Sequence, residues 1–113
     1  MIGIGVDLCE VDRMRTALGR TPTLRARVFT ADEQAYCDRR KDPTERYAAR
    51  FAAKEAVIKA IGRGVPPREI EVVSGQPPTI RLHGRAAEAA GDAEIAISLT
   101  HSRESAAAVA IAS

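Results

Sequence analysis

The chain has 113 residues, of which 45% are hydrophobic and 28% charged, and its formal net charge is +2. This composition is typical of a globular protein, and the length favours one domain spanning residues 1–113. No apolar run approaches the roughly 18 residues of a membrane span, and residues 1–7 lack the basic start of a signal peptide. We therefore expect a cytoplasmic protein without a membrane partner. Cys9 and Cys37 are too isolated for a zinc site or a disulfide scaffold.

An uneven charge distribution is the first functional signal. Residues 13–27 contain five arginines and no acidic residue. Such a local excess attracts an anionic partner, such as an acidic protein or RNA. A solvated basic face explains the pattern equally well. The segment lacks interleaved aromatic residues that could stack on RNA bases, which argues against a nucleic-acid partner.

The N-terminal residues 2–7 have the alternation of a β-strand. Apolar side chains occupy one face, and Gly3, Gly5 and Asp7 occupy the other. Glycine weakens a strand unless another backbone or a ligand must come close, so we expect a close neighbour on that face. Asp7 would then end the strand beside open space.

Helical signals fill the next part of the chain. Residues 11–18 form a short amphipathic pattern, and Thr21-Pro22 can start a helical turn, with Thr21 as the N-cap. Residues 30–37 begin with a capping-box sequence, which predicts a short helix. Residues 42–61 begin with a cap followed by a proline and predict a long helix, which Gly62 should end.

The charges of the long helix form two stripes. At about 100° per residue, Glu55 and Lys59 share one stripe, and Arg50 and Lys54 share another on a different side. An ordinary surface helix has one broad polar face. We therefore expect these charges to point into a cleft or an interface, where each needs a partner.

The second half of the sequence predicts strands around one short helix. Residues 70–73 and 79–82 read as strands, residues 84–90 as a helix, and residues 94–100 and 106–112 as a terminal hairpin. His83, before the short helix, is expected to be a surface residue. The order of elements predicts an α+β fold in which an antiparallel sheet packs against the long central helix.

Asp7 and Glu55 are a candidate metal site. Two carboxylates converging from a strand end and a helix suit Mg²⁺, which prefers oxygen ligands and keeps waters or substrate phosphates in its shell. In the structural alternative, Asp7 caps the following helix and Glu55 pairs with Lys59 at i, i+4. The pattern alone favours this alternative.

Three basic side chains add to that candidate site. Lys54 and Lys59 flank a possible metal ligand, and cations there would neutralise charge developing on phosphoryl oxygens. His101 follows an apolar strand face and has polar neighbours, so it could contact a phosphate or transfer a proton. The alternatives are solvated lysines and a hydrogen-bonded structural histidine.

Three segments together resemble one family. Residues 4–8 (IGVDL), 50–60 (RFAAKEAVIKA) and 98–102 (SLTHS) resemble the holo-acyl-carrier-protein synthases, the short single-domain class of the 4′-phosphopantetheinyl transferases. The resemblance covers essentially the whole chain in order, and the central segment is its most specific part. Residues 65–82 depart from the family pattern in a compact loop with two adjacent prolines.

The resemblance implies a specific reaction. Family members transfer the phosphopantetheine arm of coenzyme A to a serine of apo acyl carrier protein in fatty acid biosynthesis, and release adenosine 3′,5′-bisphosphate. They use Mg²⁺ and form homotrimers with active sites at the subunit boundaries. A trimer would also explain why the long helix lacks a broad polar face.

The resemblance also implies roles for individual residues. Asp7 and Glu55 match the metal ligands, and Lys59 matches the lysine that contacts the reacting phosphate, so these three form the expected catalytic set. Glu55, directly or through a metal-bound water, is the candidate acceptor of the serine proton. Coenzyme contacts are implied for Arg50, Phe51, Lys54, Lys59, Thr100 and His101. The acidic carrier protein is expected to meet Arg13, Arg20 and Arg27.

Two alternatives remain open at this point. The chain could be a small basic module without catalytic activity that binds RNA or an acidic protein through residues 13–27. It could also be the same transferase acting on the carriers of polyketide or peptide synthases. The sequence does not choose among carriers.

Overall fold

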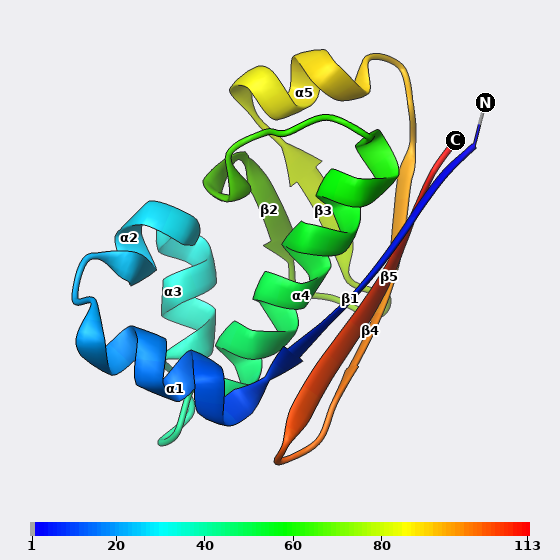
Figure 1. Ribbon diagram of the computed structural model, residues 1–113. Helices are drawn as coiled ribbons and strands as arrows, with labels where there is room; N and C mark the ends of the chain where they lie inside the picture. The colour runs from blue at the N-terminus through cyan, green and yellow to red at the C-terminus, as the bar shows by residue number, and fades with distance from the viewer. Residues whose placement is uncertain (1) are drawn as a thin grey trace.

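The structure is a computed structural model and describes residues 2–113. One strand is followed by a run of helices, then by a pair of strands, a short helix and a second pair of strands, as the sequence predicts for an α+β fold (Figure 1). The elements are β1 (Gly3–Glu10), α1 (Val11–Arg20), α2 (Leu24–Val28), α3 (Ala31–Cys37), α4 (Thr44–Ile61), the 3₁₀ turn η1 (Pro67–Glu69), β2 (Ile70–Val73), β3 (Thr79–Leu82), α5 (Gly84–Ala90), β4 (Ile95–His101) and β5 (Ser105–Ala112).

Helix α4 lies at the centre of the molecule. A three-stranded antiparallel sheet in the order β1-β5-β4 lies along one side of it, while α1, α2 and α3 gather near its N-terminal half (Figure 1). The predicted packing of an antiparallel sheet on the long helix is therefore confirmed. Strands β2 and β3 pair only with each other and form a separate two-stranded sheet.

Small residues let the sheet approach α4 closely. A side chain at Gly3 would collide with the carbonyl oxygen of Ala60, and one at Gly5 with that of Ala56. The expectation that the glycines of the first strand admit a neighbouring backbone is therefore confirmed. This close contact fixes β1 against α4 and so fixes the position of Asp7, two residues after Gly5.

The opposite face of β1 is apolar and exposed. Ile2, Ile4, Val6 and Leu8 are each between 65% and 73% exposed, and Ile111 of the paired strand β5 is 42% exposed. Exposed apolar rows of this size are unusual on a monomer and mark interaction surfaces.

The helix boundaries follow most of the predicted caps, but α4 begins at Thr44, with Pro43 rather than Asp42 in the N-cap position. Thr30 Oγ1 accepts a hydrogen bond from Glu33 N at 3.2 Å, and Glu33 Oε1 accepts one from Thr30 N at 2.9 Å, so the capping box is present. Gly62 ends α4 in the left-handed region, at φ 81°. Helix α2 begins at Leu24 rather than at Thr21-Pro22, because residues 21–24 first form a turn closed by Leu24 N and Thr21 O.

Elements of the same chain cover most of α4. Its small-residue face packs on β5 and β2, and its first half packs on α1 and on Phe29. Burial within one chain therefore already accounts for the missing polar face, without a contribution from subunit assembly. Among residues 2–113, no helix combines the length and the apolar character needed to cross a membrane.

Candidate active site

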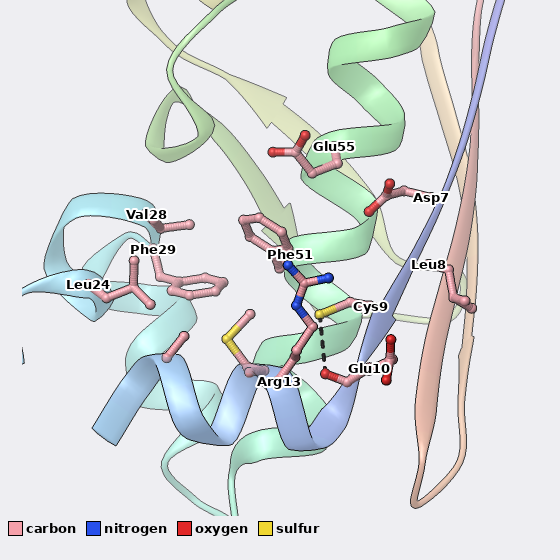
Figure 2. A pocket seen from close by; sticks show the side chains of 12 residues that line it. Asp7, Leu8, Cys9, Glu10, Arg13, Leu24, Val28, Phe29, Phe51 and Glu55 are labelled. Atoms are coloured by element: carbon pink, nitrogen blue, oxygen red, sulfur yellow. Dashed lines mark hydrogen bonds between the residues drawn. The ribbon is translucent and has the colours of Figure 1, made fainter. Parts of the chain in front are cut away.

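A pocket of about 480 Å³ opens between β1, α1, α2 and α4 (Figure 2). We name it the carboxylate pocket, because Asp7 and Glu55 line one end of it. The other end is mainly apolar and includes side chains from α1, α2 and α4. Its apolar lining consists of Met14, Ala17, Leu24, Val28, Phe29 and Phe51.

Asp7 and Glu55 line the polar end of this pocket, and Lys59 contacts Asp7. Lys59 Nζ donates hydrogen bonds to Asp7 Oδ1 at 3.2 Å and to Val6 O at 2.9 Å. Asp7 lies within strand β1, and the N-cap of α1 is Glu10, so Asp7 does not cap that helix. Lys59 pairs with Asp7 and not with Glu55. The alternative in which Asp7 caps the helix and Glu55 pairs with Lys59 is therefore ruled out.

Glu55 has a raised pKa. Burial is the main cause, and repulsion from the Asp7 carboxylate adds to it, while Lys59 acts in the opposite direction. Two carboxylates with too little compensating charge suit a cation. Within residues 2–113 no cluster of three or more His, Cys, Asp or Glu residues could hold a metal, so a bound ion would need most of its ligands from water or substrate.

Cys9 also lines the carboxylate pocket and is half-buried. Burial raises the pKa of its thiol, and Asp7 contributes in the same direction. A neutral thiol is a poor nucleophile. Cys9 therefore lines this pocket as an uncharged side chain.

Lys54 is fully buried and makes all its polar contacts within the chain. Its Nζ donates to Glu33 Oε1 at 2.7 Å, to Ile70 O at 2.6 Å and to Pro67 O at 3.1 Å. Burial lowers the pKa of Lys54, and Glu33 opposes that change. The three donors of the ammonium group are thus used. The expected contact between Lys54 and the coenzyme does not fit this position, and Lys54 is a structural residue.

Arg50 contributes to a second pocket, of about 290 Å³. Its side chain is buried, stacks on the Tyr36 ring with 4.1 Å from the guanidinium carbon to the ring centroid, and donates to Ser74 Oγ at 3.1 Å. The Nε of Arg50 has no hydrogen-bond partner among residues 2–113. We name this site the arginine pocket; its polar and charged lining includes Tyr36, Arg40, Arg46, Arg50, Ser74 and His101.

His101 ends strand β4 and lines the arginine pocket, on the same face of the strand as the partly buried Ile97 and Leu99. Its Nδ1 lies 3.0 Å from Glu45 Oε1. Thr100 is exposed on the opposite face of β4 and lines neither pocket. The structure therefore brings His101, but not Thr100, together with Arg50.

His83 has a structural contact that the sequence does not indicate. It precedes α5 as predicted, but its Nε2 also lies 2.9 Å from Glu71 Oε1. Glu71 in turn accepts a hydrogen bond from Thr30 Oγ1 at 3.1 Å. This network joins the two-stranded sheet to the start of α3.

The arginines proposed for carrier docking are all exposed. Arg13 and Arg20 are seven residues apart on α1 and so share one face of the helix. Arg13 also lines the carboxylate pocket, as Figure 2 shows, and Arg27 lies on the neighbouring helix α2. Arg15 differs, since it pairs with Asp42 at 2.8 Å.

Sequence reasoning missed part of both sites. It did not identify the apolar end of the carboxylate pocket, because Leu24, Val28 and Phe29 have no chemical signature. It also missed Glu45 and the stacking of Arg46 and Arg50 on Tyr36. Charge at the start of the long helix was the available signal for Glu45, but nothing in the sequence places it beside residue 101.

Comparison with known proteins defines the class of this fold and these sites. A model of the family described as "4'-phosphopantetheinyl transferase superfamily" matches residues 3–111. The chain therefore belongs to the 4′-phosphopantetheinyl transferase superfamily.

Within this class, the chain is similar to holo-acyl-carrier-protein synthases. The holo-[acyl-carrier-protein] synthase of Moorella thermoacetica is 44% identical over 119 aligned positions, which cover 98% of this chain and 93% of that protein. The Chronobacterium ammoniagenes ACPS–CoA complex has a TM-score of 0.83 at 30% identity, with 99% of this chain and 96% of that one covered. A Bacillus anthracis holo-(acyl-carrier-protein) synthase in complex with CoA (3′,5′-ADP) has a TM-score of 0.82 at 30% identity, covering 97% and 94%.

Proposed function

We propose that this chain transfers the 4′-phosphopantetheine group of coenzyme A to a serine of apo acyl carrier protein in fatty acid biosynthesis. The products are holo carrier protein and adenosine 3′,5′-bisphosphate. Family membership and the coenzyme A complexes of similar structures support this function over a module without catalytic activity. The observation that carries it is that Asp7 and Glu55 line one end of an open pocket, where Asp7 is also paired with Lys59.

Mg²⁺ is the metal that we propose for Asp7 and Glu55. Hard carboxylate oxygens fit it, and so does a site that provides only two protein ligands, because Mg²⁺ usually retains waters or substrate phosphates. When bound, Mg²⁺ would withdraw charge from the phosphate oxygens and stabilise the leaving group.

Glu55 and Lys59 provide the remaining chemistry. The serine oxygen forms a bond to the phosphorus on the pantetheine side, and the bond from that phosphorus to the bridging oxygen breaks. Glu55 accepts the serine proton, and its raised pKa makes it a stronger base than an ordinary carboxylate. Lys59 leaves Asp7 and donates to an oxygen of the reacting phosphate, which neutralises charge in the transition state.

The arginine pocket is the proposed site for the remaining phosphate groups of the coenzyme. Arg50 and His101 line it together with Arg40 and Arg46, and these arginines give the pocket a positive charge that would attract an anion. Phe51 lines the carboxylate pocket and would contact the pantetheine arm there. Thr100 faces away from both pockets, so its coenzyme contact would need a site shared with a second subunit.

A homotrimer is the proposed assembly. A neighbouring subunit would cover the exposed apolar row formed by Ile2, Ile4, Val6 and Leu8. These side chains are 65–73% exposed in the single chain, and that surface would become buried between subunits. Val6 lies in the middle of this row, so Val6→Lys should disrupt assembly. Light scattering should report a trimer for the wild type and smaller species for Val6→Lys. A fully active wild-type monomer at micromolar concentration would contradict a shared site.

Docking of the acidic carrier protein is proposed for the face formed by Arg13, Arg20 and Arg27. The three side chains are exposed, and opposite charges accelerate and orient encounter. Replacing Arg20 and Arg27 by Glu should raise KM for the carrier about tenfold or more, with a smaller effect on kcat. An unchanged KM would exclude these residues from docking.

The decisive experiment is a transfer assay. Purified protein, coenzyme A, Mg²⁺ and apo acyl carrier protein are incubated, and the carrier is weighed by mass spectrometry. The carrier should gain one phosphopantetheine group, and adenosine 3′,5′-bisphosphate should appear in equal amount. Parallel reactions with apo carriers from polyketide and peptide synthases rank the substrates. If no carrier gains mass, the proposed function is wrong.

A further inference from the structure

The contact between Glu45 and His101 joins two distant parts of the chain. His101 Nδ1 and Glu45 Oε1 are 3.0 Å apart, and the residues are separated by 56 positions in sequence. His101 ends β4, where it is paired with Ala106 of β5. Glu45 lies in the first turn of α4, whose start is held by hydrogen bonds from Thr44 N and Thr44 Oγ1 to Asp42. The backbone at both residues is therefore held in place by hydrogen bonds of regular secondary structure.

The chemistry of the pair determines the orientation of the imidazole ring. An ionised carboxylate can only accept hydrogen bonds, so Nδ1 of His101 must carry the hydrogen that it donates to Glu45. The two nitrogens lie on different sides of the ring, so Nε2 is turned away from Glu45. His101 lines the arginine pocket and Glu45 does not. The contact thus holds the ring at the pocket wall from behind.

The other charged groups around this pocket have different partners. Arg46 donates to Tyr36 O at 2.7 Å and stacks on the Tyr36 ring, and Arg50 stacks on the same ring from 4.1 Å. Arg40 also lines the pocket. Glu45 therefore has His101, and not these arginines, as its hydrogen-bond partner among residues 2–113.

We propose that Glu45 is a positioning residue for the coenzyme: it fixes His101 so that Nε2 faces a phosphate group bound in the arginine pocket. To donate from Nε2 while Nδ1 donates to Glu45, the ring must carry both hydrogens, and the Glu45 carboxylate balances that charge. The inference rests on the proposed function, because it takes coenzyme A as the ligand of this pocket. Glu45 acts through His101 and does not touch the reacting atoms.

A double-mutant cycle tests this coupling. Calorimetry would measure the Kd for coenzyme A of the wild type, Glu45→Ala, His101→Ala and the double variant. We expect His101→Ala to weaken binding about tenfold and Glu45→Ala about fivefold, in the range of single hydrogen bonds to charged groups. The double variant should bind no more weakly than His101→Ala, because Glu45 has no role without the histidine.

Two further variants separate positioning from charge and from folding. Glu45→Gln keeps a hydrogen-bond acceptor and should lose only about twofold in affinity. Glu104→Gln is the matched control: Glu104 is a nearby acid in the β4–β5 turn with no side-chain contact to His101 among the described residues, and its change should leave the Kd unaltered. In transfer assays, Glu45→Ala should raise KM for coenzyme A and leave kcat nearly unchanged.

Nitrogen NMR of His101 provides a readout that does not need the ligand. The wild type should show hydrogen on Nδ1, and Glu45→Ala should lose this preference. Equal losses of affinity from Glu45→Ala with and without His101, or an unchanged Kd in Glu45→Ala, would overturn the proposal. A wild type that fails to bind coenzyme A would overturn the proposed function instead, and the NMR spectrum would then decide whether Glu45 orients His101.

Discussion

Two lysines five residues apart on α4 have opposite surroundings. Lys54 is completely buried, and Glu33 of the same chain neutralises it at 2.7 Å. The Lys59 side chain is 54% exposed, and its Nζ lies 3.2 Å from Oδ1 of Asp7, a residue that lines the carboxylate pocket. Both lie in residues 50–60, and the residue pattern, without the family resemblance, makes each of them a candidate phosphate ligand.

The hydrogen-bond partners of the two lysines separate a charge that stabilises the fold from a charge that can bind a ligand. The chain itself supplies every hydrogen-bond partner that Lys54 needs, which leaves no donor for a ligand. Around Lys59, two carboxylates compete for one cation, and the pKa of Glu55 is raised by burial and by Asp7. Charge that remains uncompensated in an open pocket is the signature of a site that binds something. The following changes test this division.

Glu55→Gln, in the proposed active site, should have the largest effect on the transfer rate. The change removes a proposed metal ligand and the proposed proton acceptor while it preserves the shape of the side chain. We expect the transfer rate to fall about a thousandfold or more and the unfolding free energy to change by less than about 1 kcal/mol. Transfer assays and urea denaturation measure both. Glu88→Gln, at an exposed position on α5, is the control and should leave activity unchanged. Near-normal activity of Glu55→Gln would show that Glu55 has no part in the mechanism.

Lys54→Met, which breaks the buried ion pair with Glu33, should destabilise the fold strongly. The substitution leaves the fully buried Glu33 carboxylate without its cation, which costs about 3–5 kcal/mol for such a pair. Urea denaturation would show it directly. Adding Glu33→Gln to Lys54→Met removes the unpaired charge and should recover part of the loss. A Lys54→Met protein as stable as the wild type would show that the ion pair contributes little.

Gly5→Ala tests the packing that places Asp7 beside α4. The added methyl group would meet the carbonyl oxygen of Ala56, so β1 must move, and we expect a loss of about 2 kcal/mol or more. Gly19→Ala is the matched control, because Gly19 lies in α1 with open space around it and should gain about 0.5 kcal/mol. Thermal unfolding compares the two. A stabilising Gly5→Ala would contradict the close approach.

The pH dependence of stability should report a smaller effect from Glu55. Its pKa is raised by burial above the ordinary value of 4.5, so the folded protein binds this proton more tightly than the unfolded chain. As pH rises from about that value through the folded pKa, this group makes the metal-free protein less stable. Urea denaturation in a chelator should show this loss in the wild type and its absence in Glu55→Gln. Parallel curves for the two proteins would mean that the surroundings of Glu55 do not disfavour its charge.

Much of the fold follows from local sequence signals. The capping box at Thr30, the left-handed Gly62 and the alternation of residues 2–7 each specify an element through short-range sterics and hydrogen bonds. The strands 70–73 and 79–82 match their predicted bounds. Helix α2 starts later than predicted, since a turn at Pro22 competes with a helical start there.

The sites depend on long-range contacts that local patterns do not encode. Glu33 was expected only as a capping residue, yet it also neutralises Lys54, 21 positions away. The structural role of Lys54 therefore became visible only with the partners that tertiary structure supplies. Family resemblance indicated Asp7, Glu55 and Lys59 together, whereas the helical periodicity alone favoured an ordinary surface pair.

The kcat of phosphopantetheine transfer by Lys59→Met, measured beside its unfolding free energy, tests the division between the two lysines most directly. We predict a fall in kcat of about a hundredfold or more, with a change in unfolding free energy below about 1 kcal/mol, because Lys59 is 54% exposed and pairs with a partly exposed Asp7, and such pairs contribute little to stability. A Lys59→Met variant with wild-type kcat, or one destabilised as strongly as Lys54→Met, would contradict the account.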